Sequence, residues 1–490
     1  MNGELNVPVL SLLIWLPIIA GVAVLALSCF ARERLSRQLA NLAAWLTFFI
    51  AVYVLCQFQS ASAAMQFSER AMWIPYFGVE YALGIDGLSV LFIGMNALIT
   101  LLVIAAQKAD SKGGYLAALL MTSGLTYGAF SARDAVLFYV FFEAMLIPMY
   151  LAIGMFGGAQ RKYATTKFFL YTLFGSLFML LALFYLYGAS QTFSLEAWQH
   201  LPLSLYMQLV LFGAFFLAFA VKTPMWPLHA WAPDAYVEAP AGAAIMLAST
   251  KIGAYGFLRL LLPIVPDAAQ VLAPWMIALS LLAVIYFGFV ALAQTDLKRL
   301  IAYSSVAHMG LVTLGFFLFS AVALKGAVLL MVSNGLVVAA LFFSADALKA
   351  RMGDCRLTDC GGIVNAMPWL ATLLVFFAMA NIGLPGTSGF VGEFLVILGA
   401  VGYQLGAGLL AATVVVIGAA YTLWMVRRVV FGPVTHPTVG TLSDLGMRER
   451  LLLSVLAAVM LGFGLWPQAL LGMADASVTQ LLAHMALSKL

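Results

Sequence analysis

Residues 219–227 read Phe-Ala-Val-Lys-Thr-Pro-Met-Trp-Pro, and this short stretch decides how the chain can fold. It places a charged residue, Lys222, inside an apolar run and two prolines directly after it. Because proline removes a helix hydrogen bond, Pro224 and Pro227 predict that a helix is interrupted here. At membrane depth, such an interruption is tolerated only where the backbone is enclosed by protein or lies beside water.

The composition of the whole chain places this stretch in a membrane. Of 490 residues, only 9% are charged and 64% are hydrophobic, whereas ordinary soluble domains have roughly 25% charged residues. A soluble fold of this size could not cover so much apolar surface. The same composition excludes a disordered chain and a disulfide framework. We therefore predict an all-α polytopic membrane protein.

Apolar stretches long enough to cross a bilayer predict about 14 transmembrane helices. The first covers residues 7–31 and has no basic residue before it, unlike a signal peptide. The others centre near residues 48, 96, 122, 143, 178, 214, 250, 282, 309, 334, 382, 418 and 460.

The basic residues support an even number of spans. Seventeen of the 24 Lys and Arg residues fall in alternate connections, beginning with the first, and five fall in the other connections and the tails. Basic residues accumulate on the inner side of a membrane, so both termini are expected outside. The two that remain, Lys222 and Lys251, lie inside predicted spans.

Motifs for nucleotide or metal chemistry are absent from the sequence. It has no Walker A pattern, no dinucleotide fingerprint after a strand and no His-Glu-x-x-His pattern, nor a basic stripe typical of nucleic-acid binding. Cys355 and Cys360 share a predicted inner loop, but two thiols cannot hold an iron–sulfur cluster that needs four ligands. We therefore expect no metal, redox centre or nucleotide in this chain.

Four charged residues in predicted spans point to function: Glu143, Lys222, Lys251 and Glu393. Each would cost about 2.5–3.5 kcal/mol at the centre of a membrane helix. They could form static ion pairs that hold helices together, or they could form a relay for protons or ions. A buried lysine suits a relay because burial favours its neutral form, whereas a nearby carboxylate favours its charged form.

A second interruption is predicted near residue 386, where Gly383, Pro385, Gly386 and Gly389 lie close together. The two interruptions fall in spans seven and twelve, so spans 4–8 and 9–13 would be two inverted five-helix repeats, each with a broken helix. The predicted division is residues 1–112 for three N-terminal helices, 113–262 and 263–432 for the repeats, and 433–490 for the last helix and tail.

With these features in view, the chain resembles the antiporter-like chain M (subunit 4) family of respiratory complex I, the proton-pumping NADH:quinone oxidoreductase. The resemblance extends over nearly the whole length. Its segments are 83–89 (LGIDGLS), 138–158 (FYVFFEAMLIPMYLAIGMFGG), 221–240 (VKTPMWPLHAWAPDAYVEAP), 294–310 (QTDLKRLIAYSSVAHMG), 383–394 (GLPGTSGFVGEF), 423–432 (LWMVRRVVFG) and 466–468 (WPQ).

The resemblance implies a role for five residues as a proton relay. Glu143 and Lys222 match the ion pair of the first half-channel, and Lys251 matches the central connecting lysine. His308 matches a histidine at mid-membrane in the second half-channel, and Glu393 matches the titratable residue on the exit side. The sister chains more usually have lysine at this last position, so the glutamate favours chain M.

The implied function is translocation of H⁺ through two linked half-channels, driven by electron transfer in other subunits. Those subunits would carry the FMN, the iron–sulfur clusters and the quinone. The implied location is the bacterial inner (plasma) membrane, among lipids and with sister antiporter-like chains on either side.

The sequence departs from the family pattern at two positions. Asn334 and Tyr236 stand where the family often has histidine. Because an asparagine does not titrate near neutral pH, a relay past Asn334 must use water or another group. Two alternatives remain open: a subunit of a multisubunit sodium/proton antiporter or membrane-bound hydrogenase, and a structural membrane spacer that does not pump.

Overall fold

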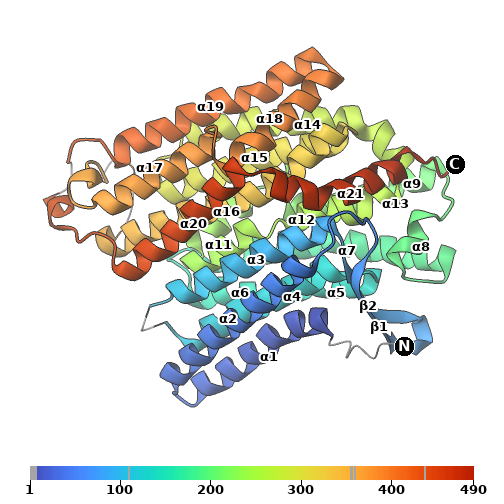
Figure 1. Ribbon diagram of the computed structural model, residues 1–490, viewed down its shortest axis with the longest axis horizontal. Coiled ribbons are helices and arrows are strands. Elements are labelled where there is room, and N and C mark those ends of the chain that lie inside the picture. The colour runs from blue at the N-terminus through green and yellow to red at the C-terminus, as the bar shows by residue number, and fades with distance from the viewer. Residues whose placement is uncertain (1–7, 109–110, 354–356, 358–359, 435–436) are drawn as a thin grey trace.

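A computed structural model describes residues 8–108, 111–353, 357, 360–434 and 437–490 as a bundle of helices that run mostly side by side (Figure 1). Helices α1 (Val9–Cys29) and α2 (Glu33–Gln57) lie along one edge of the bundle, and α19 (Leu405–Val429) lies along the opposite edge. Between α2 and α3 (Gly87–Ala106), the chain forms a two-stranded hairpin that the sequence analysis did not predict.

The hairpin pairs β1 (Gln66–Ile74) with β2 (Val79–Ile85) in antiparallel register. A short 3₁₀ turn, Pro75–Phe77, joins the strands, and Gly78 follows it with φ +63°, a conformation that glycine adopts without steric cost.

The other regular elements of the described chain are helices and short helical turns. The remaining elements are α4 (Gly113–Ser131), α5 (Ala135–Ala144), α6 (Leu146–Phe156), α7 (Arg161–Ser190), α8 (Leu195–Gln199), α9 (Leu205–Lys222), α10 (Ala232–Glu238), α11 (Ala241–Ser249), α12 (Ile252–Gly256), a π-helical segment Phe257–Leu261, α13 (Leu262–Ile264), α14 (Pro266–Leu292), α15 (Leu297–Phe317), α16 (Ala321–Met352), a 3₁₀ turn Ile363–Asn365, α17 (Pro368–Ile382), α18 (Ser388–Tyr403), a 3₁₀ turn Pro437–Thr441, α20 (Met447–Leu465) and α21 (Gln468–Ala486).

Among the described residues, 11 helices or continuous helical stretches are long and apolar enough to cross a membrane. The number rises to 12 if α20 and α21, which meet at a bend of 65°, count as one span. Helices α17 and α18 are apolar but shorter. The chain is therefore an all-α membrane protein, as predicted.

Both predicted helix interruptions are confirmed in the backbone. Helix α9 ends at Lys222 and the next helix begins at Ala232, while α17 ends at Ile382 and α18 begins at Ser388. A third interruption, which the sequence analysis did not predict, separates α11 from α12 at Lys251. There the backbone takes φ +52°, a left-handed conformation that is uncommon for a residue with a side chain.

The interrupted helices surround a deeply buried centre. In α15, in α16 and in the stretch from α11 to α13, 94% of the most apolar window is buried inside the protein, against 33% in α1 and 39% in α19. The outer helices therefore present their apolar side chains to lipid or to other proteins, whereas α15, α16 and α11–α13 form the core. The charged residues singled out from the sequence are concentrated around this core.

The last helix fastens one end of the bundle. Ser477 on α21 accepts a hydrogen bond from the backbone N–H of Gly87 at the start of α3 (2.9 Å). Beyond α21, the Lys489 ammonium group donates to the carbonyls of Trp198 (2.6 Å) and Ile264 (2.7 Å). This end of the bundle therefore depends on close contact between α3 and α21.

Gly87 makes that contact possible, so we predict that Gly87→Ala separates α21 from α3. A methyl group at residue 87 would overlap the carbonyl oxygen of Met473, and overpacking of this kind costs about 1–3 kcal/mol. The purified protein should therefore unfold at a lower temperature in a thermal denaturation assay. Gly472→Ala on α21 is the matched control, because nothing lies within 4 Å of a methyl group there. Equal melting temperatures for the two variants would show that the contact is not tight.

Candidate functional site

The first charged pair lies where α5 and α9 end. Glu143 is the penultimate residue of α5, and Lys222 is the last residue of α9. The Lys222 ammonium group donates a hydrogen bond to the carbonyl of Phe142 (2.6 Å) and lies 3.6 Å from the centre of the Phe142 ring. Both contacts stabilise a positive charge, because the carbonyl and the face of the ring are electron-rich.

Glu143 and Lys222 interact through space without a direct ion pair. Each contributes to the electrostatic environment of the other, but their charged atoms are not among the pairs within 4.0 Å in the described part of the chain. One carboxylate oxygen of Glu143 is buried and has no hydrogen-bond partner among the described residues. The two groups are thus electrostatically coupled but not in direct contact.

A small cavity connects Lys222 to the second lysine. Its volume is about 30 Å³, and Lys222, Thr223, Lys251, Ser305 and Met309 are among the residues that line it. A cavity needs roughly 10–15 Å³ to hold one water, so this one has room for one or two. Because a water can pass a proton from an ammonium group to a neutral amine, the shared cavity allows a water-mediated transfer between Lys222 and Lys251.

Lys251 occupies the third helix interruption, and its nearest polar partners are an amide and a hydroxyl. Its ammonium group donates to the amide oxygen of Asn334 on α16 (2.7 Å) and to the hydroxyl of Ser305 on α15 (3.4 Å), and only 8% of the residue is exposed. No acid of the described chain forms an ion pair with it within 4.0 Å. A charge on Lys251 is therefore held by dipoles alone.

Glycine allows the interrupted helices to meet. A methyl group on Gly253 would lie 2.6 Å from the hydroxyl oxygen of Thr223 and 2.8 Å from the carbonyl carbon of Lys222. Residue 253 must therefore remain small for α12 to pack against the end of α9. This packing sets the separation between the two lysines.

The second charged pair joins α15 to α18 and shares a proton. His308 Nε2 lies 3.3 Å from Glu393 Oε1, and both side chains are almost fully buried. The other ring nitrogen, Nδ1, lies 2.8 Å from the carbonyl of Ser304. Because a carbonyl only accepts hydrogen bonds, Nδ1 carries a proton. The contact between Nε2 and Oε1 then holds one further proton, bound either to the imidazole or to the carboxyl group.

The second interruption provides the space for that carboxyl group. Gly383 ends α17 with φ +78°, and a methyl group on it would lie 2.6 Å from Glu393 Oε2. The start of α18 is tied to α16 by a hydrogen bond between the hydroxyls of Ser333 and Ser388 (2.8 Å). Residue 333 directly precedes Asn334, so α16 contacts both the central lysine and the second broken helix.

Polar residues that the sequence analysis did not single out surround this second pair. The Ser304 hydroxyl lies 3.0 Å from that of Tyr421, and the Asn381 amide donates to Ser304 (3.0 Å) and to Thr422 (3.1 Å). The sequence could have indicated Ser304 and Ser305, because they precede His308 by four and three positions and so share its face of the helix. Asn381 and Tyr421 have no comparable signal.

The five residues singled out from the sequence thus form one series across the core. Glu143 lies beside Lys222, the cavity joins Lys222 to Lys251, and His308 contacts Glu393. Lys251 and His308 interact electrostatically, and Ser305 and Asn334 contact Lys251 and each other.

A metal site has no support within the described ranges. No group of three or more His, Cys, Asp or Glu side chains there is placed to hold a metal ion. Cys355, which was considered with Cys360, lies outside the described residues.

Comparison with known proteins shows the family. Residues 132–418 match the family model described as "NADH:quinone oxidoreductase/Mrp antiporter, TM". This match covers more than half of the chain and includes all five residues of the series.

Full-length relatives agree. The chain is 40% identical to the NADH-quinone oxidoreductase subunit M of Rickettsia prowazekii over 98% of this chain and 99% of the relative. It superposes on a chain of respiratory complex I from Thermus thermophilus with bound NADH with a TM-score of 0.88, at 33% identity over 96% of this chain and 99% of that one.

The same fold occurs in an antiporter complex. A chain of the Mrp complex from Dietzia sp. DQ12-45-1b superposes with a TM-score of 0.85 at 21% identity, over 97% of each chain. The sequence identity of the protein to the complex I subunits is higher than its identity to the chain of the Mrp complex. The protein therefore belongs to the family of NADH-quinone oxidoreductase subunit M, the antiporter-like membrane subunits of complex I.

Proposed function

We propose that the chain, as a proton-translocating membrane subunit of NADH:quinone oxidoreductase, moves H⁺ along the series Glu143, Lys222, Lys251, His308 and Glu393. Two half-channels would meet at Lys251. The observation that supports this most strongly is the environment of Lys251: a buried ammonium group with a cavity on one side and the Ser305 hydroxyl within reach.

In the first half, Glu143 would act as the switch. A proton arriving on its carboxylate removes negative charge beside Lys222 and so weakens the stabilisation of the ammonium group. Lys222 then gives a proton to the cavity, through which a water passes it to Lys251. The Phe142 carbonyl and ring hold the positive charge at Lys222 until that moment.

In the second half, Ser305 would carry the proton onward. The Asn334 amide oxygen accepts a hydrogen bond but does not titrate, so its role is to hold the Lys251 ammonium group in place. The Ser305 hydroxyl contacts both Lys251 and Asn334 and lies one helical turn from His308. The proton shared between His308 and Glu393 would be displaced when the next proton arrives.

The driving force fits charges at these separations. Moving one charge through a membrane potential of 100 mV costs about 2.3 kcal/mol. Two unit charges 4 Å apart interact by about 4 kcal/mol at an effective dielectric constant of 20. Changes of charge at successive buried sites, caused by electron transfer in other subunits, are therefore large enough to move a proton across.

The same proposal gives the chain 14 membrane crossings. Helix α4, the broken pair α17/α18 and helix α20 would add three crossings to the 11 long apolar stretches. Residues 113–262 and 263–432 would be inverted repeats, with the breaks α9/α10 and α17/α18 in corresponding places, flanked by residues 1–112 and 433–490. An even number of crossings puts both termini on one side, and the bias of Lys and Arg makes that the periplasmic side of a bacterial inner membrane.

Other subunits would supply the electron-transfer chemistry. In this proposal FMN, iron–sulfur clusters and quinone belong to partner subunits, and sister antiporter-like chains lie on either side. Large apolar side chains exposed on outer helices, such as Phe49 on α2, Phe184 on α7 and Val416 on α19, suit contact with those chains or with lipid.

One alternative function is a subunit of a sodium/proton antiporter. The matching family model includes Mrp antiporters, but the 40% identity over the whole length to a subunit M favours the oxidoreductase. A non-pumping spacer is the other alternative, and the following experiments test it.

Replacing either member of the first pair should stop proton transfer. In a complex reconstituted into vesicles, we expect Lys222→Met and Glu143→Gln to reduce the NADH-driven pH gradient and the coupled rate of quinone reduction at least about tenfold. A positioned proton-transfer group usually contributes more than this to a rate, so about tenfold is a lower bound. Lys349→Met is the control, because that lysine is exposed at the end of α16. Normal pumping and normal quinone reduction in both pair variants, with full assembly, would support a spacer.

Removing the acceptor for Lys251 should have a comparable effect. Asn334→Leu keeps the branched shape of the side chain but leaves the ammonium group without its 2.7 Å partner. A buried hydrogen bond to a charged group is worth about 1.5–3 kcal/mol, which corresponds to a loss of about tenfold or more in the coupled rate. The steady-state rate of NADH-driven quinone reduction in coupled vesicles provides the measurement. An unchanged rate would mean that Asn334 does not position Lys251.

The interruption between α17 and α18 should not tolerate a side chain at residue 383. Gly383→Ala would press a methyl group against the Glu393 carboxyl group and force residue 383 to keep φ +78°, so we expect a loss of pumping with the complex still assembled. Gly402→Ala on the same broken span has open space around it and should pump normally. If both variants pump alike, the Glu393 site does not depend on this fit.

A further inference from the structure

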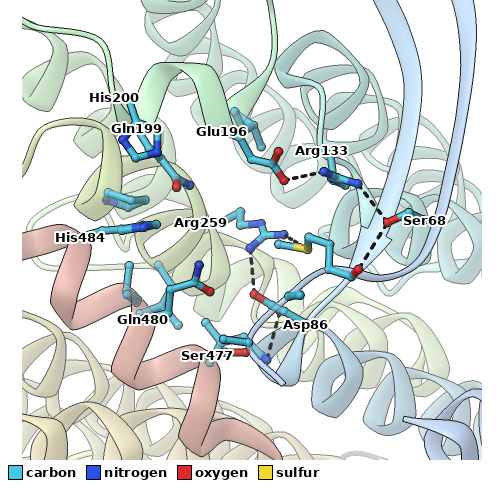
Figure 2. A pocket seen from close by; sticks show the side chains of 18 residues that line it. Ser68, Asp86, Arg133, Glu196, Gln199, His200, Arg259, Ser477, Gln480 and His484 are labelled. Atoms are coloured by element: carbon cyan, nitrogen blue, oxygen red, sulfur yellow. Dashed lines mark hydrogen bonds and ion pairs between the residues drawn. The ribbon is translucent and has the colours of Figure 1, made fainter. Parts of the chain in front are cut away.

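A cavity of about 440 Å³ opens at the end of the bundle where α3 begins and α8 and α21 lie. Figure 2 shows Asp86, Arg133, Glu196, Arg259 and His484 around it, with their polar ends toward the same space. In the proposed orientation this is the outer face. The series from Glu143 to Glu393 does not include any of these residues.

Asp86 is the buried end of this cavity. Asp86 is only 5% exposed, and one of its carboxylate oxygens accepts a hydrogen bond from Arg259 (2.9 Å). The other oxygen caps α3 by accepting from the backbone N–H groups of Leu88 and Ser89, and it also accepts from the Ser89 hydroxyl (3.0 Å). The carboxylate therefore faces the cavity on one side and a hydroxyl group on the other.

The Ser89 hydroxyl also contacts the hydroxyl of Tyr255, a residue of α12. The two hydroxyl oxygens are 2.9 Å apart, and the Tyr255 hydroxyl also donates to the carbonyl of Phe130 (2.9 Å). Tyr255 follows Lys251 by one turn, since its N–H bonds to the Lys251 carbonyl (3.0 Å). Asp86, Ser89 and Tyr255 thus lie within hydrogen-bonding distance of one another in sequence from the cavity inward, and Tyr255 is one helical turn from Lys251 along the chain.

Two aromatic rings, those of Phe92 and Phe130, form an aromatic layer that packs against Tyr255. The Phe92 and Phe130 rings lie 5.8 Å and 5.0 Å from the ring of Tyr255, and all three side chains are fully buried. The helix that carries Tyr255 continues into the π-helical segment Phe257–Leu261, which holds Arg259. π-Helical turns are frequent at functional sites and allow a helix to change register.

We propose that Tyr255, Ser89 and Asp86 form a gated outlet through which a proton leaves Lys251 for the outer cavity, and that Phe92 and Phe130 close it in the present conformation. This inference rests on the proposed function, because it needs Lys251 to carry the proton. The outlet would be a second exit for protons, which starts at Lys251, besides the exit through Glu393.

In the proposed transfer, each hydroxyl group gains one proton and loses one. An N–H bond of the Lys251 ammonium group breaks, and a water passes that proton to the Tyr255 oxygen. The Tyr255 O–H turns from the Phe130 carbonyl toward Ser89 and gives up its own proton, and Ser89 passes its proton to the Asp86 carboxylate. Asp86 releases a proton to water in the cavity, while Arg259 holds the carboxylate in place.

Passive proton leakage tests the outlet without requiring turnover. In vesicles that contain the whole complex and no NADH, Phe130→Ala should open the aromatic layer and speed the decay of an imposed pH gradient. Adding Tyr255→Phe to that variant should slow the decay about tenfold, as expected for the loss of one hydrogen bond in the series. Ser89→Ala should slow it in the same way.

Matched variants separate a proton path from loose packing. Phe212→Ala removes another buried ring, 3% exposed, from α9, and Tyr115→Phe removes a buried hydroxyl that accepts from the N–H of Ala243 (3.0 Å). Neither should leak, nor should Tyr115→Phe suppress the leak of Phe130→Ala. If Phe130→Ala does not assemble, Phe92→Leu opens the same layer.

Two results would overturn the outlet: no leak when the layer is opened in an assembled complex, or a leak that persists unchanged without the Tyr255 hydroxyl. Either result would leave Asp86 and Arg259 as a structural cap on α3. Because the leak is measured without NADH, these results are distinct from a failure of the Glu143 and Lys222 variants, which would overturn the relay itself.

Discussion

A lysine buried without a carboxylate partner is the constraint on which the rest of this structure depends. Lys251 lies in the core between α11, α15 and α16, and among the described residues its ammonium group donates hydrogen bonds to the Asn334 amide oxygen and the Ser305 hydroxyl alone. Dipoles stabilise a charge less than a carboxylate would, so the charge is not fixed there permanently. In the proposed relay, the cavity toward Lys222 would be its source of protons and His308 its destination.

The broken helices follow from this constraint. A continuous helix keeps its backbone hydrogen bonds inside and its side chains outside, whereas the ends of broken helices bring backbone groups to the charged residues. Lys222, Lys251 and Glu393 all lie at or near such ends, and Gly253 and Gly383 provide the space in which those ends approach each other or a carboxyl group. Replacing a glycine therefore moves a charge, not only the packing.

The sequence predicted the parts of this arrangement that local chemistry determines. Proline after Lys222 and glycine around residue 386 predicted two interruptions, because such signals are visible within a few residues. Charges within apolar runs singled out four of the five candidate residues, and the family resemblance added His308. The interruption at Lys251 has no such signal, since no proline adjoins it. The contact with Asn334 joins residues 83 positions apart and depends on how α11 and α16 pack. The hairpin of β1 and β2 was missed because apolar composition gave no alternating pattern there.

Proton pumping by a Lys251→Met variant of the reconstituted complex tests the central claim most directly. Methionine fills the space of the lysine but cannot hold a proton, so the account predicts an assembled complex with no proton transfer through this subunit and with slowed coupled quinone reduction. A complex that assembles, reduces quinone and builds the pH gradient at wild-type rates would contradict it.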